Sequence, residues 1–118
     1  AIRAGGIGGQ TADTAWTSLA PTPPHPEYPA AHGCVTGAVA PLIAGFFNTT
    51  RVYIVTDSNA VPGGTRTHTF EDTRDLVDEV FWARVYGGMH FLHSLQTGVQ
   101  MGDGIAAQLL RNYFRPSL

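Results

Sequence analysis

Apolar residues recur at helical spacing in three parts of the chain, and this pattern predicts three helices. The first is expected from 31 to 46, the second from about 70 to the Gly87-Gly88 pair, and the third from about 91 to 113. Pro41 should kink the first helix. That helix also carries a second stripe made only of small residues, which should let another helix approach closely: Gly33, Gly37, Ala40 and Ala44.

The pattern changes between the first and second helices. Residues 51–56 and 65–70 are rich in β-branched and aromatic types, and turn-forming residues separate them, which predicts a β-hairpin. Thr69, followed three residues later by Asp72, resembles a capping box for the second helix. The expected fold class is therefore mainly α, the helical-bundle portion of a larger fold with one small hairpin.

The first 30 residues show neither helical nor strand periodicity. A glycine-rich stretch is followed by a proline-rich run from Pro21 to Pro29, which indicates loop and then extended backbone. The 118 residues suit one domain, with 1–30 as an extended loop region and 31–118 as helices with a hairpin. A loop of this length in a small domain is expected to pack along another element or to be functional.

Composition excludes several classes of function. The net charge is −2 and all the basic residues are arginines, so the chain has no basic tract for nucleic acid. No apolar stretch reaches the roughly 20 residues that a membrane-spanning helix needs. Cys34 is the only cysteine, which rules out an internal disulfide. The single indication of secretion is the N-glycosylation pattern that begins at Asn48.

Arg84 is the first residue that points to chemistry. It lies seven residues after Val77 and four after Val80, so it shares their apolar helix face. A guanidinium on such a face needs an anionic partner, because burying an unpaired charge costs free energy. The partner is either an internal carboxylate or a bound oxyanion, whose shape the forked guanidinium suits.

Two histidines occupy comparable places. His90 follows Gly87-Gly88 at the expected start of the third helix, and His32 lies at the start of the first. The free N–H groups and the dipole of a helix N-terminus favour an anion there. Each histidine has an alternative role as a structural hydrogen-bonding or capping residue, and His93 competes for any role given to His90.

A zinc site is a weaker alternative. The chain has no HExxH motif and no pair of cysteines at ligand spacing. Zinc ligands would have to come from a set with no recognisable spacing: His25, Glu27, His32, His90 and His93.

Two short runs resemble motifs of the vanadium-dependent haloperoxidases and the type 2 phosphatidic acid phosphatase superfamily. Residues 26–32, Pro-Glu-Tyr-Pro-Ala-Ala-His, resemble the family's second motif, Pro-Ser-Gly-His. Ala83-Arg84, five further residues and then His90 resemble the third, which reads Ser-Arg, five residues, His, three residues, Asp. The contexts at 16–26 and 87–91 are also similar, so the chain resembles the C-terminal portion of such a protein.

The resemblance has informative departures. Ala30 and Ala31 stand where the second motif has serine and glycine, and Ser94 stands where the third has aspartate. The first motif, with its lysine and Arg-Pro, is absent, and Ala1-Ile2-Arg3 resembles the residues that follow it. The missing groups are therefore expected from an upstream N-terminal segment or from a second chain, including a second copy in a homo-oligomer.

The resemblance implies a cofactor and a set of roles. Vanadate is the expected cofactor, with phosphate as the alternative. His90 would bind vanadium directly or attack phosphorus, Arg84 and the backbone N–H of Ala31 would hold the oxygens, and His32 would act as acid or base. The implied function is halide oxidation by hydrogen peroxide if the upstream segment is present. The alternatives are a soluble acid phosphatase and a non-catalytic storage, binding or interaction protein derived from this fold.

Overall fold

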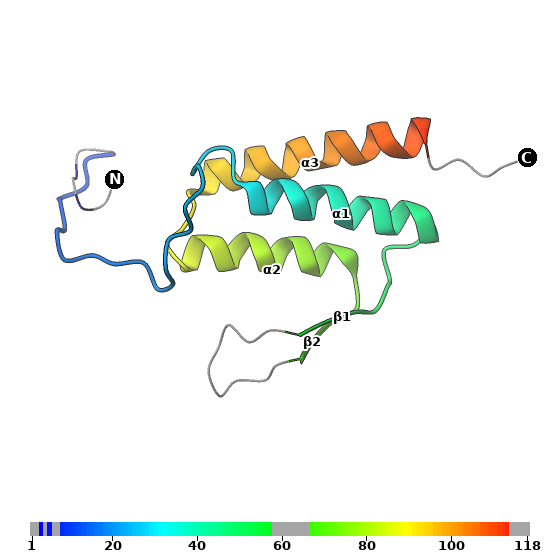
Figure 1. Cartoon of the computed structure of the whole chain (residues 1–118), viewed down its shortest axis with the longest axis horizontal. Helices are drawn as coiled ribbons and strands as arrows, with labels where there is room; N and C mark the ends of the chain where they lie inside the picture. Colours follow the sequence, from blue (N-terminus) through cyan, green and yellow to red (C-terminus); the bar gives the residue numbers. More distant parts are fainter. Residues whose placement is uncertain (1–2, 4, 6–7, 58–66, 114–118) are drawn as a thin grey trace, which may run out of the picture.

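Three helices and a two-stranded hairpin make up the chain. The computed structural model describes residues 3, 5, 8–57 and 67–113. In chain order the elements are α1 (Ala31–Phe47), β1 (Ile54–Asp57), β2 (Thr67–Phe70), α2 (Thr73–Tyr86) and α3 (Leu92–Asn112). Figure 1 shows α1 between α2 and α3, with α1 and α3 running in the same direction and α2 in the opposite one. The prediction of a mainly helical fold with one hairpin is confirmed.

The small-residue stripe of α1 packs against α3. A Cβ added to Gly37 would lie 2.7 Å from the carbonyl oxygen of Val99, and one added to Gly102 would meet the backbone of Cys34. Helices approach this closely only where side chains are missing, so glycine is required on both helices. The close neighbour predicted for this stripe is thus α3 of the same chain, and the stripe itself needs no partner.

The buried core is small. Its apolar residues are Ala30, Ala40, Phe70, Leu95 and Ala106. The larger apolar residues of α1 point outward instead, and Val35 and Phe46 are 60% and 72% exposed. The radius of gyration is 17.1 Å, whereas a compact chain of this length would have about 13.5 Å. Much apolar surface therefore remains uncovered in the part of the chain that the structure describes.

The hairpin determines where α2 begins. Its antiparallel strands pair Ile54 with Phe70 and Val55 with Thr69, so these last two residues are extended. The prediction that α2 starts near Phe70 with Thr69 as its cap is wrong, because backbone in a strand cannot also open a helix. Asp72 is the N-cap, and its carboxylate accepts from the N–H of Arg74 at 2.9 Å. The predicted turn formers at 58–64 lie outside the described residues.

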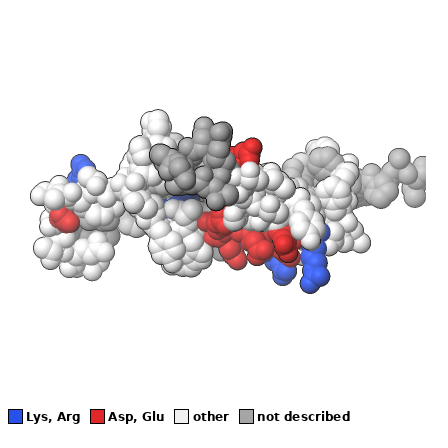
Figure 2. Space-filling model, turned by 90° about the horizontal axis from the view of Figure 1, so that it is seen from below, with Lys and Arg blue, Asp and Glu red and all other residues white. Residues whose placement is uncertain are grey.

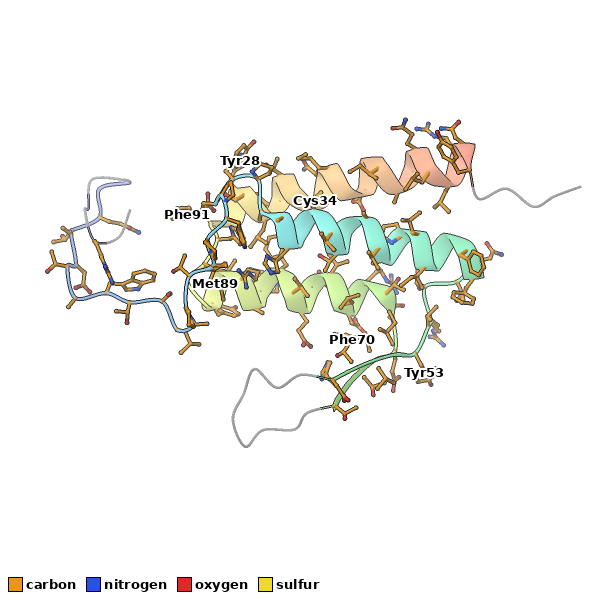
Figure 3. All side chains as sticks on the ribbon, viewed as in Figure 1. Tyr28, Cys34, Tyr53, Phe70, Met89 and Phe91 are labelled. Carbon is orange, nitrogen blue, oxygen red and sulfur yellow. The ribbon has the colours of Figure 1, made fainter. Side chains whose placement is uncertain are left out.

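The helix directions bring the starts of α1 and α3 and the end of α2 to one end of the molecule. Figure 3 shows Tyr28, Met89 and Phe91 at this end, with Tyr53 and Phe70 toward the other. Among the described helices, none combines the length and apolar character that crossing a membrane would take.

Candidate functional site

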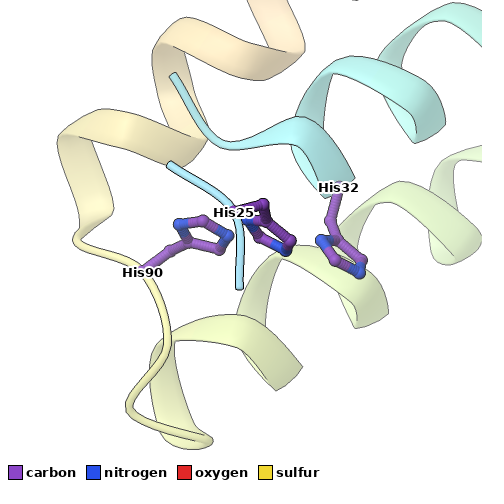
Figure 4. Close-up of side chains that lie close together, drawn as sticks. All are labelled: His25, His32 and His90. Carbon is purple, nitrogen blue, oxygen red and sulfur yellow. The ribbon is translucent and has the colours of Figure 1, made fainter. Parts of the chain in front are cut away.

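Three histidines gather where the helix ends meet (Figure 4). His25 comes from the proline-rich segment (residues 21–30), His32 from the first turn of α1, and His90 from the turn between α2 and α3. The ring of His25 lies 5.4 Å from that of His32 and 5.5 Å from that of His90, centroid to centroid. One ring nitrogen from each lies within 4.8 Å of the others. The fold therefore joins segments up to 65 positions apart into one cluster.

The turn after α2 places His90. Gly88 has a φ of +73°, which favours glycine. The N–H groups of Met89 and His90 both donate to the carbonyl of Arg84, at 3.0 and 3.3 Å. Trp16 lies against Gly88, where a Cβ would come 2.8 Å from its ring. The helix α3 begins at Leu92, so His90 stands two residues before the start rather than at it.

The hydrogen bond at one nitrogen of His90 settles which nitrogen is free. Its Nδ1 lies 2.9 Å from the backbone carbonyl oxygen of Glu27. A carbonyl oxygen only accepts, so Nδ1 carries the proton and donates. In the neutral ring Nε2 then has a free lone pair, and this atom is buried without a hydrogen-bond partner among the described residues. The His90 side chain is 1% exposed, which makes this unpartnered atom the notable feature of the site.

The other two rings also carry a buried nitrogen without a hydrogen-bond partner among the described residues. His25 Nδ1 lies 3.1 Å from the carbonyl oxygen of Pro26, which leaves Nε2 as the free atom. That Nε2 and the Nδ1 of His32 are both buried, and neither has a partner within the described ranges. A buried polar atom without a partner costs about 1–3 kcal/mol, so three such atoms in one place favour a ligand.

Arg84 adds a positive charge. It lies in the last turn of α2, and its Nε and Nη2 are buried with no hydrogen-bond partner in the described part of the chain. Burial lowers the pKa of Arg84. Burial also lowers the pKa of His32, and the charge of Arg84 acts in the same direction, as do His25 and His90. No carboxylate among the described residues pairs with Arg84, so the internal salt bridge considered above does not form there.

The charges around the histidine cluster indicate whether its ligand would be a cation or an anion. Three imidazole nitrogens are suitable ligands for zinc. However, a buried guanidinium with no described carboxylate opposes a divalent cation close by and favours an anion. The N-termini of α1 and α3 at the same end also favour an anion, while the C-terminus of α2 acts in the opposite direction. The set of nitrogen atoms therefore fits an oxyanion better than a metal cation.

The remaining residues named from the sequence lie in different places. Ala31 is the first residue of α1, where an N–H has no acceptor within the helix. Ala30, in the position of the motif serine, is fully buried and donates its N–H to the carbonyl of Ser94 at 3.1 Å. His93 is exposed and stacks on Tyr28 at 5.7 Å, outside the histidine cluster.

Sequence reasoning gave two residues of this region too little weight. The sequence offers His25 and Glu27 only as possible zinc ligands and as members of the runs 16–26 and 26–32, although both lie beside His90. The carboxylate of Glu27 accepts from Ser94 Oγ at 2.8 Å and from the N–H of Phe91 at 2.9 Å. Burial raises the pKa of Glu27, but these hydrogen bonds and the contact with His90 outweigh it, so the pKa lies below its ordinary value. Their position within seven residues of His32 was the available indication.

A surface pocket of about 370 Å³ opens next to the cluster. His90 lies in its wall, and its other lining residues are largely apolar: Trp16, Thr22, Val85, Gly88, Met89, Phe91 and Leu92. A small organic molecule could approach His90 through this pocket.

The chain is similar to a known family domain and to several solved structures. The family model described as "VCPO second helical-bundle domain" matches residues 3–116. The crystal structure of the first bacterial vanadium-dependent iodoperoxidase superposes with a TM-score of 0.72 at 28% identity, covering 87% of this chain and 24% of that one. No match was found among proteins with curated functions.

Two structures of bacterial vanadium-dependent chloroperoxidase, in holo and apo forms, also share the fold. They are 23% and 22% identical, with TM-scores of 0.63 and 0.64, and each match covers 91% of this chain and 26% of the other. The chain thus spans about a quarter of the length of these solved structures.

Proposed function

This chain belongs to the VCPO second helical-bundle domain family, and from that premise we propose that it carries part of a vanadate site at which the whole protein oxidises halide with hydrogen peroxide. The observation that carries the proposal is the set of buried nitrogens without described partners on Arg84, His25, His32 and His90. Vanadate is a compact oxyanion, and this set supplies one fixed cation and several imidazole nitrogens. The residues present therefore fit the group.

We assign each residue a role that its geometry supports. His90 would bind vanadium through Nε2, the atom left free by the hydrogen bond at Nδ1. Arg84 would hold two oxygens with Nε and Nη2, which point in the fork geometry of a guanidinium. The N–H of Ala31 would donate to a further oxygen at the start of α1. Bound vanadate would supply the Lewis-acid centre that activates hydrogen peroxide.

His32 would move protons. Its pKa is lowered by burial and then by the charges around it, so the neutral ring persists to lower pH than an ordinary histidine. A neutral imidazole next to the anion can accept a proton from the oxidant and return it later. His25, stacked on His90 with an interplanar angle of 17°, would restrict the His90 ring.

Further groups from outside this chain would complete the site. The sequence contains no lysine, and the solved relatives are about four times longer than the matched region. The exposed apolar face of α1 is a surface on which another part of the protein, or a second copy of the chain, could lie. We propose that the covering segment brings the additional positive charge.

An acid phosphatase is the second candidate, and one observation favours it. The free lone pair of His90 Nε2 is what a nucleophile for phosphorus needs. Vanadate and phosphate share the geometry that such a site binds. A non-catalytic binding protein is the third candidate, since Ala30 has no side-chain hydroxyl to offer the oxyanion.

The test uses the protein at its natural full length. We expect vanadate binding by ⁵¹V NMR, and bromination of a phenol dye when vanadate, peroxide and bromide are present together. His90→Gln should abolish both, because it removes the proposed vanadium ligand. His93→Gln is the matched control, since His93 is an exposed histidine three positions along the chain.

The outcomes separate the candidates. Turnover of p-nitrophenyl phosphate without peroxide, lost in His90→Gln, would replace the haloperoxidase proposal with the phosphatase. Vanadate binding without either activity would support the non-catalytic protein. Tight zinc binding that is lost in His25→Gln, with no vanadate binding, would reject the oxyanion site altogether.

A further inference from the structure

Glu27 occupies an unusual position between two segments. Glu27 lies in the proline-rich segment, yet the hydrogen-bond partners of its side chain are at the start of α3, 64 and 67 positions along the chain. One carboxylate oxygen accepts from the N–H of Phe91, the N-cap of α3, and the other accepts from Ser94 Oγ. The first oxygen also lies 3.5 Å from His90 Nδ1. Glu27 therefore fastens the proline-rich segment to the start of α3.

This fastening holds a second group in place. The backbone carbonyl of Glu27 is the acceptor for His90 Nδ1, at 2.9 Å. The carbonyl can stay there only while the segment keeps its position against α3. The hydrogen bonds of the carboxylate thus act on the His90 ring through the backbone of the same residue.

The residue at position 94 is complementary to this arrangement. Ser94 is 2% exposed, and its hydroxyl donates to Glu27 at 2.8 Å. A carboxylate at position 94 would face the carboxylate of Glu27 at hydrogen-bond distance, and two like charges there repel. A hydroxyl donor at 94 and a carboxylate at 27 are therefore a matched pair.

We propose that Glu27 is the positioning residue of His90, acting from the proline-rich segment. By clamping that segment to Phe91 and Ser94, it keeps the proton of His90 on Nδ1 and Nε2 free for a ligand. The effect on the tautomer follows from the hydrogen bonds themselves. The effect on anion binding rests on the proposed function.

A second Glu–His contact on the chain shows what a plain surface pair is like. Glu79 and His68 lie 3.0 Å apart, but their side chains are 55% and 52% exposed. The His90 side chain, in contrast, is 1% exposed and Glu27 has two further donors. Glu79→Ala is therefore a matched control for Glu27→Ala.

The first experiment reads the tautomer of His90 by long-range ¹H–¹⁵N NMR of the protein labelled in its histidine rings. In the wild type, and in Glu79→Ala, the proton should be on Nδ1. Glu27→Ala should give a mixture of tautomers, because the clamp and its acceptor are released. Helical circular dichroism checks that the variant is folded, and Glu27→Gln, which keeps the side chain's shape, gives a smaller effect. An unchanged tautomer in folded Glu27→Ala would overturn the proposal.

The second experiment measures vanadate affinity by ⁵¹V NMR in a double-mutant cycle. Loss of a group that orients a ligating histidine typically weakens binding by about 10–100-fold. We expect about 10-fold for Glu27→Gln, and a similar loss for Ser94→Asp from repulsion. The double variant should recover most of the affinity, since the amide introduced at 27 would donate to the carboxylate introduced at 94. Additive losses would contradict the proposed pairing.

The two experiments separate the two ideas. If the wild type binds no vanadate but the Nδ1 proton is lost in Glu27→Ala, the positioning role stands and the proposed function fails. If vanadate binds with His90→Gln sensitivity but Glu27→Ala changes neither tautomer nor affinity, the proposed function stands and the positioning role fails.

Discussion

The two ends of α2 carry the same kind of side chain in opposite circumstances. Arg74, in the first turn, is 75% exposed and forms an ion pair with Asp72 at 2.8 Å. Arg84, in the last turn, has buried Nε and Nη2 atoms and no carboxylate among the described residues. At the first end the arginine is neutralised by a carboxylate of the same chain. At the second end the arginine has no such partner among the described residues.

The surroundings extend this contrast. Acidic side chains gather on the face seen in Figure 2. Glu71, Asp72, Asp75 and Asp78 lie together at and near the start of α2. A surface pocket there is lined by both basic and acidic side chains. At the other end three imidazoles form the cluster, and the carboxylate beside His90, on Glu27, accepts hydrogen bonds from Ser94 and Phe91. Arg74 thus has a carboxylate partner within the described chain, whereas the proposed function gives Arg84 an anion as its partner.

The largest expected effect is on the stability of the whole helical bundle, which holds both ends of α2 in place. In Gly102→Leu the new side chain would meet the backbone of Cys34 and Ala38, which cannot move aside. We expect the melting temperature to fall by about 15 °C or more, as overpacking against backbone costs several kcal/mol. Gly104→Leu is the control on the same helix, because a Cβ there meets nothing within 4 Å. Equal melting temperatures for the two variants would refute the close α1–α3 packing.

The second prediction separates the two arginines by binding. Arg84→Ala should lower vanadate or phosphate affinity by about 100-fold, because two charge-assisted hydrogen bonds are lost. Arg74→Ala should leave affinity within about twofold, since its partner is Asp72 at the other end. Isothermal titration calorimetry measures both. A comparable loss in the two variants would remove the distinction between the ends.

The third prediction concerns the effect of Arg84 on the melting temperature of the protein when no anion is bound. Arg84→Met keeps an unbranched side chain, although a shorter one, and removes a charge whose Nε and Nη2 are buried, so the melting temperature should rise by about 5 °C in anion-free buffer. Added phosphate should raise the melting temperature of the wild type but not of this variant. A fall in the anion-free melting temperature would instead show that Arg84 has an internal partner.

The fourth prediction concerns the hairpin end of α2. Asp72→Ala removes the N-cap of α2 and should lower the melting temperature by about 5 °C at pH 7. The side-chain hydrogen bond from Arg74, its N–H and Thr50 hold the pKa of Asp72 well below its usual range. A depressed folded pKa contributes stability above the unfolded pKa of about 4 and loses it as the pH falls further. The gap between wild type and variant should therefore narrow below about pH 4, while a constant gap would argue against a charged cap.

The helices were predictable because they depend on local spacing. The range expected for α1 ends one residue before the observed helix, and the glycines on α3 that match its small-residue stripe are themselves visible in the chain. The start of α2 was not predictable in the same way. Thr69 and Asp72 both look like caps, and only the pairing of Thr69 with Val55 removes the first.

The candidate site divides in the same manner. Arg84, His32 and His90 stood out because each lies on an apolar face or near a helix start, and motif spacing links them. His25 and Glu27 lie at bends in a segment without helix or strand, and such a segment has no periodicity that would indicate the direction of a side chain.

The sequence by itself therefore determined the helices, the small-residue stripe and the residue types able to hold an oxyanion, since these depend on neighbours within a few positions. Only the tertiary structure decided that α3 fills that stripe and that His25 joins His32 and His90. It also decided that Glu27 reaches Ser94, 67 positions away. Such contacts depend on how the helices are oriented, and a linear pattern does not contain that information.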